Sequence, residues 1–322
     1  MAKIIRQNFV KNLVLITGLT RSGKTMLLPI VASMERVEHV AMNFLMEQIP
    51  MMHILGLMSD ETAICLMRYA VDVMFYDISI GRNLNLRFGD LSSVWKSSQP
   101  FHYLKRLFAK EGNAALELII KKNHFFLLQV HDALWHADIY CKSFPDMKMI
   151  HITRHPIDMV YDWYGKGYGG DFFENPRNAT LTIEWKSRQI PYYAAGWEEE
   201  YVNMPEIDRV IHMIKRLEDN HRKKYDSLPE IERHKIKIIS FERMLTEPEP
   251  ILRDISDFLG TSLTRHTARI CKRERCPRKL YREDRDRKLD KIKALCSDDA
   301  FTILMSMSKE YEDLYGKNVT YT

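Results

Sequence analysis

The chain has 322 residues, of which 45% are apolar and 28% are charged, so it can bury one large α/β core or two modest ones and is not a disordered polyelectrolyte. Its formal net charge of +5 is too small to indicate a nucleic-acid partner, but it suits a protein that binds a multiply phosphorylated anion. No run of about 18 apolar residues occurs, so we expect no membrane span. The five cysteines are scattered, so we expect reduced thiols. Because the first residues also lack the features of a signal peptide, we expect a cytoplasmic location.

The predicted secondary structure alternates between short apolar strands and amphipathic helices. Buried strands are predicted at residues 12–17, 124–130, 147–153 and 235–240. Helices are predicted at residues 24–34, 60–80, 100–122, 134–143 and 204–227, and they dominate from residue 250 onwards. This alternation predicts an α/β fold in three layers, with a parallel sheet flanked by helices. We expect one domain over residues 1–322, with a helical, aromatic-rich insertion at about 161–235.

The segment Gly18–Thr25 follows the first predicted strand and opens the first predicted helix. It matches the pattern G-x-x-x-x-G-K-[ST] at every fixed position. The glycines let successive backbone N–H groups point at the oxygens of a phosphate, and the helix N-terminus adds a partial positive charge. The segment therefore predicts a binding loop for phosphate or a similar anion, without indicating which donor is bound.

A nucleotide hydrolase or kinase normally adds a carboxylate at the end of a second strand, where it holds Mg²⁺. Here the strand at 147–153 is followed by Arg154, and the strand at 235–240 is followed by Phe241. Asp77 closes an apolar run, but it lies within a predicted helix. We therefore expect no metal site.

Three blocks of sequence, in the same order along the chain, resemble the sulfotransferase family. Residues 21–25 are similar to the family's loop for the 5′-phosphosulfate group. Residues 150–161 resemble its 3′-phosphate motif, a strand that ends in Arg-x-Pro-x-Asp and leads into a helix. Residues 238–260 look like a later segment that begins near Tyr-Glu-Asp-Leu and ends a helix in Phe-Leu-Gly.

The resemblance implies a donor, 3′-phosphoadenosine-5′-phosphosulfate, and transfer of its sulfuryl group to a hydroxyl or amine of a small-molecule or glycan acceptor. It also allows a homodimer. The donor would contact the loop and the 3′-phosphate motif. The residues implied in binding it are Arg21, Ser22, Gly23, Lys24, Thr25, Arg154, Asp162, Arg278 and Lys279.

Two positions depart from the family pattern and keep alternatives open. Asp162 stands eight residues after Arg154, where the family generally has a serine, and a carboxylate there opposes a phosphate unless a cation offsets it. Lys24 stands where the family usually has Thr or Ser, which completes a Walker-type loop. An ATP- or GTP-dependent small-molecule kinase and a non-catalytic nucleotide-binding protein therefore stay as alternatives.

His131 directly follows the strand at 124–130, which places it at the carboxyl end of that strand. It resembles the family's catalytic histidine in position, and a histidine suits proton abstraction near neutral pH. Asp132 is a second candidate base, and a structural role for His131 is the alternative. Arg21 and Lys24 are the candidate catalytic cations, because they can neutralise charge on the leaving phosphate.

Eleven aromatic residues lie between Tyr161 and Tyr201, many more than composition predicts. They would either stack on a sugar, base or phenol, or form the core of a helical segment. The glycine-rich stretch 165–191 is a candidate mobile loop beside the site. Arg82 and Arg87 would either meet an acidic acceptor or form ion pairs within a loop.

Overall fold

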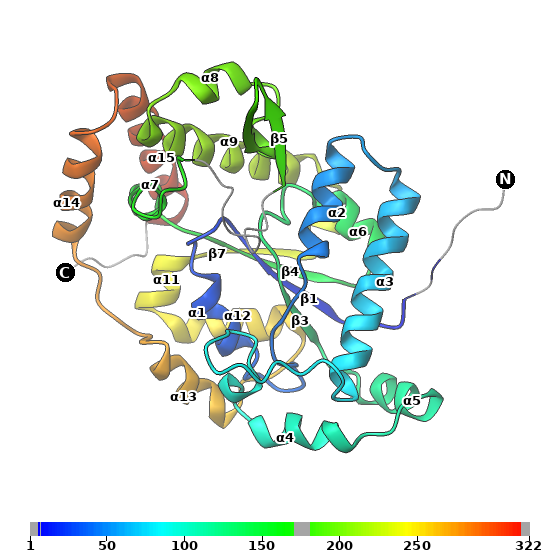
Figure 1. Ribbon diagram of the computed structural model, residues 1–322. Helices are drawn as coiled ribbons and strands as arrows, with labels where there is room; N and C mark the ends of the chain where they lie inside the picture. Colours follow the sequence, from blue (N-terminus) through cyan, green and yellow to red (C-terminus); the bar gives the residue numbers. More distant parts are fainter. Residues whose placement is uncertain (1–5, 7, 171–180, 317–322) are drawn as a thin grey trace.

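The computed structural model describes residue 6 and residues 8–170 and 181–316 (Figure 1). Five parallel strands form one sheet in the order β2 (Ala41–Met42), β3 (Phe126–Gln129), β1 (Leu13–Thr17), β4 (Lys148–Thr153) and β7 (Ile236–Ser240). Leu15 in the central strand β1 pairs with Leu128 of β3 and with Met149 of β4. Because all strands are parallel, their carboxyl ends and the loops that follow them meet at one edge of the sheet.

Helices cover both faces of the sheet, because alternate residues of each strand face opposite layers. Leu13, Leu15 and Met149 pack toward α2 (Leu45–Ile54), α3 (Asp60–Ser79) and α6 (Ala137–Ser143). Val14, Ile16 and Ile150 pack toward α1 (Lys24–Val31), α11 (Phe241–Thr246), α12 (Pro248–Leu259) and α13 (Arg265–Arg273). Figure 1 shows these two groups of helices on opposite sides of the strands. The predicted three-layer α/β fold is confirmed.

A third apolar cluster lies beyond the carboxyl edge of the sheet. It joins α7 (Pro156–Tyr164), α8 (Glu198–Asn203), α9 (Glu206–Ser227), α14 (Arg282–Lys293) and α15 (Asp298–Tyr315). Trp163, Trp197 and Tyr201 are buried in this cluster. Helix α9 has its apolar residues on one face, which packs against α7 and α15 in Figure 1. These helices stand beside the loops that carry the candidate site.

One prediction of secondary structure was wrong. The single helix expected at 100–122 is divided into α4 (Pro100–Leu104), a short 3₁₀ turn at Lys105–Phe108, and α5 (Asn113–Lys122). Gly112, just before α5, has φ of +93°, which no helix interior adopts.

Part of the stretch 165–191, which was expected to be an irregular loop, forms an antiparallel hairpin, β5 (Thr182–Trp185) and β6 (Arg188–Pro191). Lys186 and Ser187 both have positive φ, as a tight two-residue hairpin turn requires. Short α10 (Glu230–Arg233) then precedes β7. Residues 171–180 of the stretch predicted to be a mobile loop lie outside the described residues.

Candidate active site

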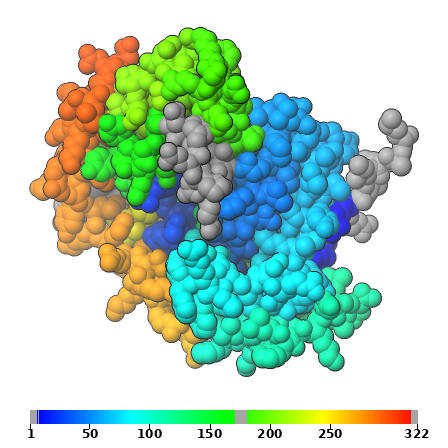
Figure 2. Space-filling model, in the orientation of Figure 1, coloured from blue at the N-terminus to red at the C-terminus, as the bar shows by residue number. Residues whose placement is uncertain are grey.

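The loop Gly18–Thr25 connects β1 to α1 at the carboxyl edge of the sheet. Two of its positions require glycine. A Cβ at Gly18 would lie 2.3 Å from the carbonyl oxygen of Ile152, and a Cβ at Gly23 would lie 2.2 Å from the ring of Phe241. The first N–H groups of α1 have no acceptor within the helix, so they face the loop. Figure 2 shows the dark-blue segment that contains this loop recessed between cyan, green and orange parts of the chain.

Lys24 is buried beneath the loop that it ends. Its Nζ donates to the carbonyl oxygens of Gly18 and Leu19, both at 2.7 Å. Burial lowers the pKa of Lys24 to about 8, although Asp132 and Glu47 oppose this shift by favouring the charged form. The ammonium group therefore places a positive charge under the loop at neutral pH and loses it in mildly alkaline solution.

Ser22 carries a buried hydroxyl that has no hydrogen-bond partner among the described residues. Its backbone N–H donates to the carbonyl oxygen of Leu19. Buried polar atoms are almost always paired in folded proteins. The unpaired hydroxyl, the two obligatory glycines and the free N–H groups together form a cradle that fits an anion.

Arg154 follows β4 and reaches the same edge. Its Nη1 donates to the carbonyl oxygen of Arg21 at 2.9 Å and to Asp162 Oδ2 at 2.8 Å. Asp162 Oδ2 also lies 3.6 Å from Nη2 of Arg21. The carboxylate at the position where the family has a serine is thus paired with both arginines, which offsets its charge. Arg154 Nε is buried and has no partner in the described part of the chain.

Phe241 brings the loop and the arginines together. The guanidinium of Arg154 lies 4.9 Å from the centre of the Phe241 ring, and that of Arg278 lies 5.9 Å from it. The same ring packs against Gly23. Arg278 therefore lies on the same ring as Arg154. Lys279 is exposed, and within the described part of the chain it has no contact with the Phe241 ring like that of Arg278.

His131 is held by Glu47, which comes from α2. Glu47 Oε1 lies 2.8 Å from His131 Nδ1 and accepts the backbone N–H of His131 at 2.9 Å. A carboxylate only accepts hydrogen bonds, so Nδ1 carries the proton and Nε2 is left as the basic atom. The side chain of His131 is 25% exposed to solvent. A histidine held in this way can accept a proton at Nε2.

Asp132, the second candidate base, is buried, and burial raises its pKa to about 6. Its Oδ1 lies 3.7 Å from Nε2 of His221. Asp132 has φ of +53°, a conformation that aspartate tolerates better than most residues.

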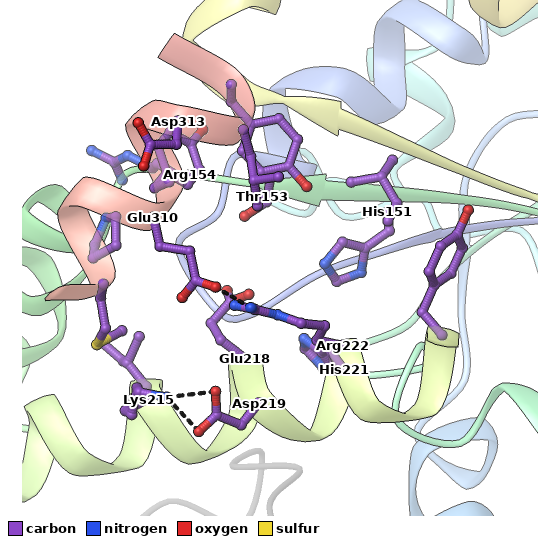
Figure 3. Close-up of a pocket in the computed structure, with 18 of the residues that line it drawn as sticks. His151, Thr153, Arg154, Lys215, Glu218, Asp219, His221, Arg222, Glu310 and Asp313 are labelled. Atoms are coloured by element: carbon purple, nitrogen blue, oxygen red, sulfur yellow. Dashed lines mark hydrogen bonds and ion pairs between the residues drawn. The ribbon is translucent and has the colours of Figure 1, made fainter. Parts of the chain in front are cut away.

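His221 belongs to a polar cavity of about 710 Å³ between β4, α9 and α15, here called the α9–α15 cavity (Figure 3). Figure 3 shows His151 and Thr153 facing Glu218, Asp219 and Arg222 across this space. Dashed lines there mark the ion pairs of Arg222 with Glu310 and of Lys215 with Asp219.

Of the nine clustered aromatic residues that the structure describes, four are buried and five are partly buried. Trp163, Tyr192, Trp197 and Tyr201 are buried, so the core interpretation is confirmed for them. Trp163 Nε1 also donates to the carbonyl oxygen of Thr20 at 2.7 Å, which ties α7 to the phosphate loop.

The two arginines of the 82–87 segment form local ion pairs. Arg82 pairs with Asp77 and Glu111, and Arg87 pairs with Asp90. Their interpretation as loop ion pairs is confirmed.

Within the described ranges, no helix is long and apolar enough to cross a membrane. Nor do the side chains described there include a cluster of three or more His, Cys, Asp or Glu that could hold a metal ion.

Sequence reasoning missed Glu47 and the role of Phe241. Glu47 is 84 residues from His131 in the chain, and no motif around it signals the contact. Phe241 does follow a predicted strand, a position that places it at the same edge as the loop.

Comparison with known proteins gave one family and several distant structures. Residues 11–294 match the family model described as the sulfotransferase domain. No curated protein matches the chain.

Among solved structures, the chain is similar to the sulfotransferase domain of the Synechococcus PCC 7002 olefin synthase, at 12% identity over 96% of this chain and 97% of that one, with a TM-score of 0.48. It is also similar to sulfotransferase STF9 from Mycobacterium avium, at 13% identity over 97% and 78% of the two chains, with a TM-score of 0.47. A sulfotransferase from Alicyclobacillus acidocaldarius has 15% identity over 98% of each chain and a TM-score of 0.38.

Proposed function

This chain belongs to the sulfotransferase family, and we propose that it transfers the sulfuryl group of 3′-phosphoadenosine-5′-phosphosulfate to a hydroxyl or amine of an acceptor. One observation carries the choice of donor. Phe241 packs against Gly23 of the phosphate loop on the one hand and against the guanidinium groups of Arg154 and Arg278 on the other. Two neighbouring anion sites that share one ring suit a nucleotide with phosphates at two separate positions.

The residues present fit such a donor. The unpaired hydroxyl of Ser22 and the N–H groups of Lys24 and Thr25 would hold the 5′-phosphosulfate end. Arg154 would hold the 3′-phosphate, because its buried Nε has no partner among the described residues and a guanidinium binds phosphate through parallel hydrogen bonds. Asp162 keeps Arg154 at this edge until a phosphate competes for it.

The bound donor supplies a sulfuryl group whose sulfur forms a bond to the acceptor oxygen or nitrogen while the bond to the bridging phosphate oxygen breaks. His131 takes the acceptor proton at Nε2, and Glu47 holds Nδ1–H and stabilises the imidazolium that results. Lys24 and Arg21 supply positive charge beside the departing phosphate. The proton then leaves His131 to solvent, to which the side chain is partly open.

A thermal-shift comparison tests the donor directly. Adenosine 3′,5′-bisphosphate at 100 times its dissociation constant should stabilise the protein by about 2.7 kcal/mol, because it binds only the folded state. ATP with Mg²⁺ should stabilise it much less, since only the phosphate loop would be engaged. Stabilisation by ATP with Mg²⁺ alone would favour the kinase alternative and overturn the proposal.

Turnover is tested with the phosphosulfate donor and a panel of acceptors, by measuring release of adenosine 3′,5′-bisphosphate. We expect release that persists when divalent metals are chelated, since Arg21 and Lys24 neutralise the leaving phosphate. Tight binding of the bisphosphate with no turnover for any acceptor class would instead identify a non-catalytic nucleotide-binding protein.

A further inference from the structure

We propose that the acceptor is an uncharged, extended apolar alcohol or phenol, bound in a cavity of about 1030 Å³ between α2, α3 and the loop at residues 83–94. The inference rests on the proposed function, because it places the acceptor beside the phosphate loop. The cavity reaches Thr25 of that loop and Gln129 at the end of β3. We call it the acceptor cavity.

Its walls are apolar and open to solvent. Six large apolar side chains that line it are between 38% and 55% exposed: Met42, Phe44, Leu45, Leu66, Tyr69 and Val73. Single exposed apolar residues are ordinary, but a contiguous set around one cavity marks a binding surface. The set would cover the body of an apolar ligand.

The charges around the cavity leave no place for an anionic acceptor. Asp90 is the one charged side chain among its described lining residues, and it is paired with Arg87 and accepts a hydrogen bond from Asn85. His39 also lines the cavity, and burial lowers its pKa to about 4, so it is neutral. An acidic glycan or peptide would be desolvated here without a counter-charge, which is costly.

Two buried polar atoms of the described lining residues have no partner there, and both of these atoms accept hydrogen bonds. Gln129 Oε1 and His39 Nδ1 are buried atoms with no partner in the part of the chain that is described. His39 Nε2 lies 2.8 Å from the carbonyl oxygen of Ser93, so it carries the proton and Nδ1 is an acceptor. A ligand hydroxyl is the group that would donate to such atoms.

Two amide side chains at the rim, those of Asn83 and Asn85, are engaged within the protein. Asn83 donates to Asp77, and Asn85 donates to both Asp90 and Ser92. A neutral glycan carries a hydroxyl on most carbons and would find too few free partners. An apolar molecule with one or two hydroxyls matches this cavity better. Of the two acceptor classes expected from the sequence, small molecules and glycans, we therefore favour a small molecule.

The test uses the purified full chain, the phosphosulfate donor and primary alkanols from 1-butanol to 1-decanol, with cellobiose and an acidic tyrosine peptide as competitors. Each added methylene that is buried should raise kcat/KM about fourfold until the cavity is filled. In parallel, 1-octanol should raise the melting temperature of protein saturated with adenosine 3′,5′-bisphosphate. A flat dependence on chain length, absence of stabilisation, or faster transfer to cellobiose or the peptide would each overturn the inference.

Two charged variants test the position of the cavity. Leu66→Asp and Val73→Asp alter exposed wall residues, so folding should be kept. We expect each to lower kcat/KM for 1-octanol at least tenfold while bisphosphate binding is unchanged. Ile231→Asp is the matched control, because Ile231 is 73% exposed and lies outside the cavity. Equal effects of the control and wall variants would contradict the assignment.

The two proposals fail in different ways. If adenosine 3′,5′-bisphosphate does not bind, the proposed function fails and the acceptor inference fails with it. If the bisphosphate binds and transfer occurs, but only to polar or charged acceptors, the proposed function stands and the acceptor inference is wrong.

Discussion

The phosphate-loop edge and the α9–α15 cavity are two polar regions that meet at Arg154, and they differ in how their charges are matched. At the edge, Lys24 and Arg154 stand beside unpaired donors. In the cavity, five acidic side chains outnumber four basic ones, and Arg222 and Lys215 are already paired with carboxylates. Polarity alone therefore does not distinguish the two regions as anion sites; the proposed site for the phosphosulfate has a surplus of hydrogen-bond donors without a partner among the described residues.

The largest expected difference is in turnover, between variants of two histidines, one in each region. His131→Ala should lower turnover by about 10² to 10⁴ with bisphosphate affinity kept, since it removes the proposed base. His221→Leu should leave turnover within about twofold, because a buried ring whose two nitrogens lack hydrogen-bond partners among the described residues is replaced by an apolar one. Steady-state kinetics with 1-octanol, together with bisphosphate titration, measures both. Loss of bisphosphate binding in His131→Ala would contradict its role.

Two arginines, one in each region, should differ in how much they contribute to binding of the bisphosphate. Arg154→Ala should weaken bisphosphate binding about 10- to 150-fold, the effect of losing 1.5–3 kcal/mol of hydrogen bonding to a charged group. Arg222→Ala should change it less than about twofold, because Arg222 is exposed and paired with Glu310. Isothermal titration of the bisphosphate gives both constants. Comparable losses in the two variants would erase the distinction between the regions.

The buried ammonium of the loop predicts a pH dependence of donor binding. The pKa of Lys24 is lowered to about 8, so above pH 8 the free protein loses this charge while the phosphates stay fully ionised. Affinity for the bisphosphate should then fall by up to about tenfold per pH unit.

The lowered pKa of Lys24 has the opposite effect on the stability of the unliganded protein, which should rise with pH. Between pH 8 and the ordinary lysine pKa of 10.5, the unfolded chain binds more protons, so Lys24 makes the folded state more stable as pH rises. Lys24→Arg should flatten the binding profile, because a guanidinium stays charged. An equal slope in the variant and the wild type would show that another group is responsible.

The smallest expected effect is a pH dependence of stability in the α9–α15 cavity. Burial raises the pKa of Glu218 to about 7, and the negative charge of Asp132 adds to the shift. The folded state therefore binds more protons than the unfolded chain between about pH 4.5 and pH 7, and Glu218 makes it less stable as pH rises through that range. Glu218→Gln should be more stable than the wild type by on the order of 1 kcal/mol at pH 8.

Urea unfolding at pH 5 and pH 8 measures the effect of Glu218. At pH 5, close to the unfolded pKa of 4.5, the free energies of unfolding of the wild type and Glu218→Gln should differ less than at pH 8. Asp226→Asn is the control, because Asp226 lines the same cavity but is exposed. An unchanged difference between the two pH values would contradict the assignment.

The sequence was sufficient to predict the loops, strand ends and helices that are specified by residues close together in the chain. The phosphate loop lies in one contiguous motif, Arg154 follows a recognisable strand, and α3 and α9 have clear apolar periodicity. These predictions hold because a turn, a strand end or an amphipathic helix is specified within one short segment.

How these segments contact one another could be seen only in the tertiary structure. The contact of Glu47 with His131, the position of Phe241 between the loop and Arg154, and the acceptor cavity all join residues far apart in the chain. The order of the strands sets these contacts, because it decides which loops meet at the carboxyl edge. The break before α5 was missed because the turn conformation at Gly112 interrupts a helical pattern, and the hairpin β5–β6 was missed because its tight turn at Lys186 and Ser187 lies in a stretch that the sequence indicates only as a loop.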